Sequence, residues 1–326
     1  MSEYQYSEFQ TIDRPLTDRQ MRELREISTR ATITRTRFSN YYTYGDLKAN
    51  SRDLLVRYFG ASLSFAHWFY VELAFRFPKT AVDMRGPRRY AAGQSLDMHS
   101  TGGNAVVAVA VERDDVEPED DGQGWLSSLT AIRADIAGDD ARALYFAWLL
   151  DVQSGEFDDD VVEPARPDGL GSLSPALDSF IDIMGLDRDL LAAAVDGASK
   201  APAIPPAREI DRWIARLDAD ERVALLSRVA RGEGTVGAEL MRRFRKQAPA
   251  HAATLSLRTA GALRARAEVL AEQRREVSSR EKPRSACVVS ASRPRPVTSS
   301  EHLGNAPGRR LAAGRGARHR EAPWRL

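Results

Sequence analysis

The pair of side chains best suited to chemistry is Asp97 and His99, two residues apart in the segment DMHS. On a strand they would share one face, where a carboxylate can orient an imidazole or the two can share a metal ion. A metal or hydrolytic site needs a further ligand or nucleophile. The candidates, Asp114, Asp115 and His67, are distant in sequence. A metal-dependent hydrolase is therefore the least favoured of three functional classes, and we predict no metal site or catalytic residue.

A second pattern is GEGTVG at residues 232–237, which approaches the glycine fingerprint of dinucleotide sites. In those sites the glycines follow a strand and open a helix that binds a pyrophosphate. Here the preceding segment, DERVALLSRVAR, has helical spacing instead. We therefore interpret Gly232 as a helix C-terminus and Thr235 as the N-cap of the next helix, and we predict no cofactor.

Two acidic segments, 113–122 and 151–160, carry several aspartates each. A helix–loop–helix calcium site needs oxygen ligands at loop positions 1, 3 and 5 and glycine at position 6. A loop starting at Asp151 places Glu156 where the glycine should be. We interpret both segments as solvated loops.

The candidate contact residues for nucleic acid are Arg242, Arg243, Arg245 and Lys246, at the end of TVGAELMRRFRKQ. This segment is the third of three short predicted helices. A recognition helix reads bases mainly with its N-terminal residues, and this helix has only Thr235 and Glu239 there. The basic end suits phosphate contacts, but it suits the helix dipole and a solvated surface equally well.

The composition describes an ordinary globular chain. It has 326 residues, 43% hydrophobic and 29% charged, with a formal net charge of +1. These values predict about two domains and argue against general polyanion binding. The single cysteine, Cys287, excludes an internal disulfide, and the N-terminus lacks the pattern of a signal peptide, so we expect a cytoplasmic protein.

The N-terminal part, 1–115, predicts an α+β domain with the order β-α-β-α-β-β. The second helix of this order is expected over 51–77, with Ser51 as N-cap and Pro78 after its end. Its uncharged run, Tyr58 to Val71, is too short to span a bilayer. We expect a helix with two apolar faces in the core, with Phe69 among its buried side chains, and no membrane contact.

The remainder predicts a helical region over 123–275, with acidic or proline-rich linkers near 156–173 and 198–207. Residues 281–326 carry a net charge of +7, which leaves −6 on the rest of the chain. This tail lacks Ile, Met, Phe and Tyr, so we expect it to be disordered. Its Arg, Ala, Pro, Gly and Ser are also what GC-rich DNA encodes when it is read out of frame.

Three phrases, MSEYQYSEFQTIDRPLT, DLLVRYF and ALYFAWLLDVQSGEFDDD, resemble a family of uncharacterised bacterial proteins from GC-rich genomes. The likeness covers roughly residues 1–275. It implies no activity, substrate, cofactor or functional residue. Members of the family continue with a long Ala/Arg/Glu-rich helix where this chain departs from the pattern, which favours the out-of-frame interpretation of the tail.

The sequence as a whole favours a non-enzymatic interaction or accessory protein that contacts another protein through its helical half. The basis is an ample set of amphipathic helices without an assembled catalytic constellation. The alternative is a nucleic-acid-associated protein that contacts phosphates with its basic helix ends, including Arg264, Arg266 and the tail.

Overall fold

The structure is a computed structural model that describes residues 5–43, 47–66, 70–112, 122–198, 206–247 and 258–281. The chain divides into two units, Met1–Arg280 and Glu281–Leu326, and every element described here begins in the first. Phe69 and the tail after Glu281 lie outside the described residues, as does most of the boundary predicted between 115 and 123.

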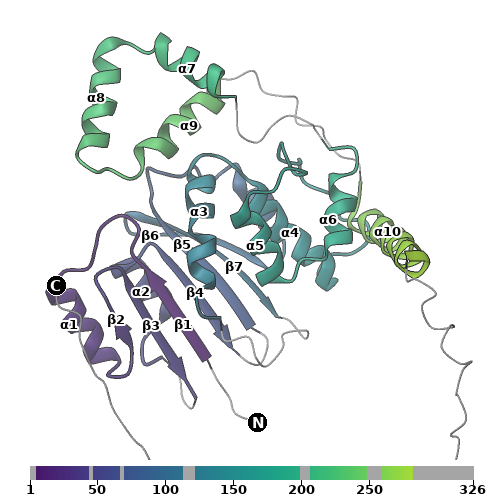
Figure 1. The fold of residues 1–326 in the computed structure, drawn as a ribbon, viewed down its shortest axis with the longest axis horizontal. Coiled ribbons are helices and arrows are strands. Elements are labelled where there is room, and N and C mark those ends of the chain that lie inside the picture. The colour runs from purple at the N-terminus through teal and green to yellow at the C-terminus, as the bar shows by residue number, and fades with distance from the viewer. Residues whose placement is uncertain are drawn as a thin grey trace, which may run out of the picture. The chain divides into compact units, whose positions relative to one another are not determined.

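The protein is α+β, as the sequence predicted (Figure 1). Seven strands of the described chain form one antiparallel sheet in the order β2-β3-β1-β4-β5-β7-β6. The strands are β1 (Gln5–Gln10), β2 (Thr32–Ile33), β3 (Arg37–Tyr42), β4 (Ala61–Ala66), β5 (Tyr70–Pro78), β6 (Leu96–Thr101) and β7 (Asn104–Glu112). The helices are α1 (Asp18–Ile27), α2 (Ser51–Tyr58), η1 (Pro87–Tyr90), α3 (Trp125–Ala137), α4 (Arg142–Ser154), α5 (Pro175–Met184), α6 (Arg188–Val195), α7 (Ala207–Arg216), α8 (Ala219–Ala230), α9 (Val236–Gln247) and α10 (Ala260–Glu281).

The prediction of a single helix over 51–77 was wrong. Only its first part is helical, as α2, and Asn50 rather than Ser51 caps it by accepting from Arg52 N and Asp53 N. The rest forms β4 and β5, which pair antiparallel from Ala61 opposite Phe75 to Ala66 opposite Tyr70. The expectation that this stretch is core is confirmed for its described residues, because Phe65, Phe75 and Phe77 are each no more than 2% exposed.

Both faces of the sheet are covered, which explains why β4 and β5 mimic a doubly apolar helix. One face, with Leu63 and Leu73, packs in the same core as α3 to α6. The other face, with Phe9 and Ala74, packs against α1 and α2. Strands that are buried on both sides lose the alternation of apolar and polar residues and become continuous apolar runs.

Local capping signals in the sequence define the starts of α1 and α5. The Thr17 side chain accepts from Gln20 N, and the Gln20 side chain accepts from Thr17 N, which closes a capping box at the start of α1. Ser174 accepts from Leu177 N, and Pro175 occupies the first position of α5. These caps fix where each helix begins on the sheet.

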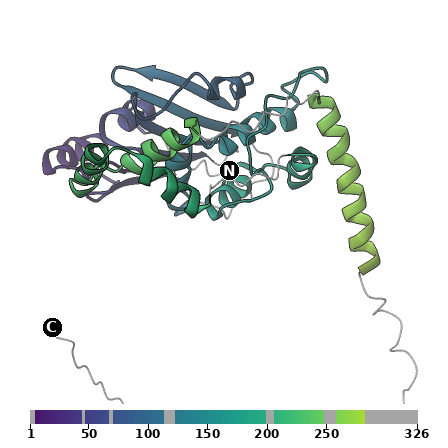
Figure 2. The same cartoon turned by 90° about the horizontal axis from the view of Figure 1, so that it is seen from above.

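The acidic stretch 156–173 contributes to packing. Phe157 and Leu170 are buried, and Glu163 accepts from the guanidinium of Arg258 at 2.8 and 2.9 Å. The backbone N of Ala260 donates to Val161 O at 2.8 Å, and this hydrogen bond attaches the start of α10. Figure 2 shows α10 as the helix that leads into the grey trace.

Candidate functional site

The helices α7, α8 and α9 form a small unit with its own core. Trp213 of α7, Leu225 of α8 and Phe244 of α9 are each 7–8% exposed. The rings of Trp213 and Phe244 meet edge to face at 5.7 Å, and Trp213 Nε1 donates to Gln247 Oε1 at 2.7 Å. These contacts join α7 to α9, and none of the three short helices is long enough to be stable alone.

The basic end of α9 faces the rest of the protein. Arg242 Nη1 donates to the carbonyl of Thr80 at 3.2 Å, and Arg245 Nη1 donates to the carbonyl of Gly138 at 2.6 Å. Arg243 forms an ion pair with Glu221 of α8. Lys246 is exposed. Three of the four predicted nucleic-acid contacts therefore hold the helical unit together or attach it to the sheet and α3.

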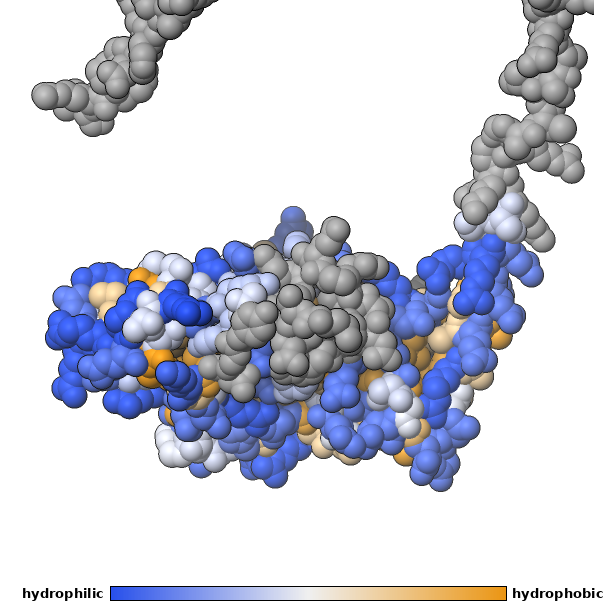
Figure 3. All heavy atoms as spheres, turned by 90° about the horizontal axis from the view of Figure 1, so that it is seen from below, coloured by the Kyte–Doolittle hydropathy of each residue, from blue (hydrophilic) through white to orange (hydrophobic). Residues whose placement is uncertain are grey.

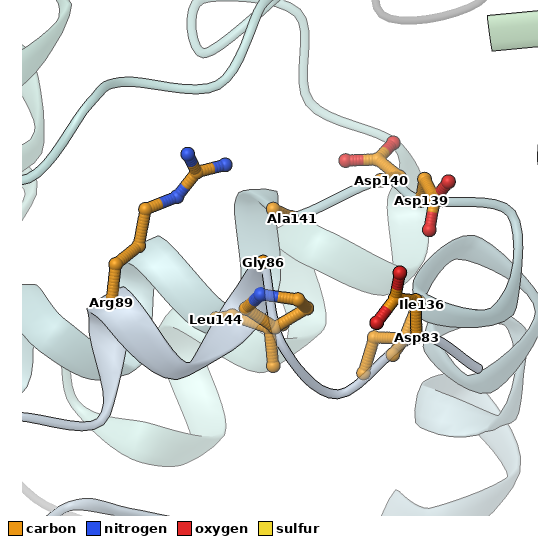
Figure 4. Close-up of a pocket in the computed structure, with 9 residues that line it drawn as sticks. Asp83, Gly86, Arg89, Ile136, Asp139, Asp140, Ala141 and Leu144 are labelled. Atoms are coloured by element: carbon orange, nitrogen blue, oxygen red, sulfur yellow. The ribbon is translucent and has the colours of Figure 1, made fainter. Parts of the chain in front are cut away.

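A pocket of about 250 Å³ lies beside this attachment, and acidic side chains line part of its wall. In Figure 4 the carboxylates of Asp83 and Asp139 lie on one side of the pocket and Arg89 lies on the other. Burial raises the pKa of Asp139, and the charges of Arg242 and Lys246 act in the opposite direction. The cations of α9 thus neutralise an acidic pocket wall.

On α8, an apolar stripe is exposed beside the buried Leu225. Val223, Leu226 and Val229 are 62%, 68% and 56% exposed. Their three-residue spacing places them on one side of the helix, and we call these three residues the α8 stripe. Ala219 and Ala230 are exposed beside it, and the exposed Arg222, four residues before Leu226, lies on the same side of the helix. Large apolar side chains grouped on one surface mark a contact site more often than scattered ones do.

The opposite side of α8 is polar and has its partners within the protein. Arg228 forms ion pairs with Glu233 at 2.8 Å and with Glu239 at 2.9 Å. The turn around Gly232 separates α8 from α9, as predicted for GEGTVG, and Gly232 has a φ of +75° that suits glycine. The α8 stripe is therefore not needed to assemble the three helices.

The pair Asp97 and His99 does share one face of β6, where His99 Nδ1 lies 3.2 Å from Asp97 Oδ2. Arg52, in the first turn of α2, binds Asp97 and also contacts Glu72 of β5 at 3.4 Å. Tyr70 donates to Glu72 at 2.7 Å. The arginine joins a carboxylate of β5 to one of β6, the two strands on either side of β7, which anchors α2 to the sheet.

The described residues bring together no three His, Cys, Asp or Glu side chains that could hold a metal ion. Nor does this part of the chain contain a helix with both the length and the apolar character to cross a bilayer. No family model, curated protein sequence or solved structure matches the chain.

Sequence reasoning missed the α8 stripe, although a signal for it was present. The segment DERVALLSRVAR carries Leu225 on one side of a helix and Val223 and Leu226 on another, with Val229 between the two sides. A short helix in a three-helix unit can bury only one of these sides. The second apolar side was therefore evidence for a contact beyond the unit.

Proposed function

We propose that this protein is a non-enzymatic interaction or accessory protein that binds another protein through the helices α7 to α9. The observation that carries the proposal is the α8 stripe, with its three large apolar side chains each more than half exposed. A partner helix or apolar groove that covers these side chains would gain the free energy of removing them from water.

Two features of the unit support this role. The contact between Trp213 and Phe244 gives the three helices a defined arrangement, so that α8 presents its stripe from a preformed surface. The bonds of Arg242 and Arg245 attach the opposite side of the unit to the rest of the protein. A cytoplasmic location would suit the single cysteine, Cys287.

The nucleic-acid alternative has weaker support in the same region. Phosphate binding uses guanidinium N–H groups, and Arg242, Arg243 and Arg245 each already donate one of theirs to a carbonyl or carboxylate oxygen within the protein. A partner that competes for them would have to replace these contacts.

Affinity recovery from an extract of the source cells tests the proposal. The full chain is compared with Leu226→Asp, which places a charge in the stripe, and with Ala224→Asp, which places one on another exposed side of α8. We expect discrete proteins to be recovered by the unaltered chain and by Ala224→Asp, and to be lost with Leu226→Asp.

The same proteins recovered by all three forms would contradict the proposal. Recovery of nucleic acid that weakens steeply with salt and is unaffected by Leu226→Asp would favour the alternative.

A further inference from the structure

A polar cleft of about 680 Å³ lies well away from the α8 stripe, at α1 and the end of α2. One wall is the segment that leads into α1 and its first two turns, from Thr11 to Glu23. The other wall is residues 56–59, at the end of α2, and Arg76 and Asn104 close the cleft from β5 and β7. The volume is within the range of small-molecule sites in proteins, about 300–1,000 Å³.

The cleft is rich in positive charge. Four arginines line it, Arg14, Arg19, Arg57 and Arg76, against two carboxylates, Asp13 and Glu23. Arg14 is exposed and forms no ion pair or side-chain hydrogen bond in the described part of the chain. The excess of guanidinium groups in a concave site attracts an anion, because the walls exclude part of the screening water.

The rim of the cleft already holds one anionic group with converging donors. Glu23 accepts from Tyr58 OH at 2.6 Å, from Arg19 Nε at 2.9 Å and from Arg57 Nη2 at 3.1 Å. The hydrogen bond from Tyr58, followed by the bond from Arg19, lowers the pKa of Glu23. The guanidinium groups of Arg19 and Arg57 are thereby drawn toward the cleft from two different helices.

Arg76 is fixed at the floor of the cleft. Its Nε donates to Phe59 O at 2.6 Å, its Nη1 donates to Asn104 Oδ1 at 3.0 Å, and its Nη2 donates to Asp13 Oδ2 at 2.9 Å. Arg133 holds the same carboxylate of Asp13 at 2.9 and 3.0 Å from behind. A charge that is held in place before binding costs less entropy to use than a freely rotating one.

The remaining polar groups of the cleft suit hydroxyls. Thr11, Thr17, Gln20 and Asn104 contribute hydroxyl and amide groups. Thr17 and Gln20 bond each other in the capping box and Asn104 Oδ1 accepts from Arg76, so a ligand would use the donors that these bonds leave over, such as the amide N–H groups of Asn104. A ligand that combines an anionic group with several hydroxyls would use both sets of groups. A carboxylic acid or a bare inorganic anion would use only the arginines.

We infer that this cleft binds a small phosphorylated polyol of the sugar-phosphate class. The phosphate lies against Arg14 and Arg19, since guanidinium groups bind phosphate oxygens with paired hydrogen bonds. The hydroxyls of the sugar lie toward Asn104 and the threonines. This ligand site is independent of the protein contact proposed for α8.

Titration calorimetry on the full chain at constant ionic strength tests the inference with four probes. These are ribose 5-phosphate, unphosphorylated ribose, inorganic phosphate and a short single-stranded oligonucleotide. We expect ribose 5-phosphate to bind at least about tenfold more tightly than either ribose or phosphate, as two sets of contacts should.

The variant Arg14→Gln/Arg19→Gln should weaken that binding at least about tenfold, because it removes two of the three exposed cations of the cleft, the third being Arg57. The control Arg22→Gln/Arg216→Gln removes two exposed arginines from α1 and α7 outside the cleft and should leave affinity unchanged. Melting temperatures equal to that of the unaltered protein establish that each variant is folded.

Four results would overturn the inference. They are no binding of ribose 5-phosphate up to millimolar concentration, equal affinity for ribose or for phosphate alone, tighter binding of the oligonucleotide, and equal losses in the two variants.

Discussion

At the scale of single residues, the tightest constraint is the approach of Gly93 to Asp151. A Cβ atom at Gly93 would lie 2.3 Å from the Cγ and Oδ2 atoms of Asp151, in a buried part of α4. We expect Gly93→Ala to lower the free energy of unfolding by about 1–3 kcal/mol through overpacking. Gly86→Ala is the matched control, because Gly86 has helical backbone angles and open space around it. Urea denaturation measures both, and an equal effect would disprove the close contact.

Asp151 also predicts a dependence of stability on pH. Its Oδ1 accepts from Gln94 N at 3.0 Å and from Ser95 N at 2.8 Å, but burial outweighs these bonds and raises its pKa. A raised pKa means that the folded protein holds this proton more tightly than the unfolded chain does. The resulting stabilisation is present below the unfolded pKa, near 4, and is lost as pH rises through the folded value.

The variant Asp151→Asn isolates this effect because asparagine does not titrate in that range. As the pH of the urea denaturation is raised from 4 to 8, the free energy of unfolding of Asp151→Asn should increase relative to that of the unaltered protein. Asp160→Asn, at an exposed aspartate, should show no such trend. A difference between Asp151→Asn and the unaltered protein that stays constant with pH would show that folding does not raise the pKa of Asp151.

At the scale of elements, Arg245 should hold the helical unit to the rest of the protein. Its bond to the carbonyl of Gly138 connects α9 with the end of α3, and Arg245→Gln removes the guanidinium that makes it. We expect faster amide hydrogen exchange in α9 with unchanged protection in β5 and β7. Lys246→Gln, one residue on and exposed, should leave the exchange of α9 as it is. Equal exchange in both variants would mean that the bond to Gly138 does not hold α9.

The strands and helices show what could be predicted from the sequence. Caps at Thr17 and Ser174 and the apolar segments of β6 and β7 can be seen in the sequence, because these signals are local. The expected helix over 51–77 failed because the sheet is covered on both faces, which is a tertiary fact. Gly60 was the local signal against it, since glycine is a poor residue for a helix interior. A Cβ atom at Gly60 would lie 2.9 Å from the Cβ of Ile12.

The candidate sites were less predictable than the elements. The basic cluster of α9 is visible in the sequence, but its partners, Thr80 and Gly138, are 162 and 107 residues from the arginines that bind them. Which side of α8 is buried depends likewise on Trp213 and Phe244 of the neighbouring helices. Periodicity gives the faces of a helix, whereas tertiary packing decides which face remains exposed.

At the scale of the whole molecule, a variant that ends at Arg280 should keep the melting temperature of the full chain to within about 2 °C. The residues removed contain almost no large apolar side chains with which to offset the entropy of ordering them. A fall of several degrees in a thermal scan would show that residues 281–326 stabilise the fold and would overturn this expectation.

Figure 3 shows one face of the molecule as mainly hydrophilic, with hydrophobic residues in small separate patches. The proposed function depends on one local cluster, the α8 stripe. A test of this contact has to report which residues of α8 touch the partner.

Site-specific photocrosslinking in the source cells is that measurement. A photoreactive amino acid is placed at Leu226, in the stripe, or at Ala224, exposed on another side of the same helix. We expect a discrete crosslinked protein from position 226 and none from position 224. Crosslinks of equal yield from both positions, or none from position 226 while the protein is folded and abundant, would contradict a partner contact through α8.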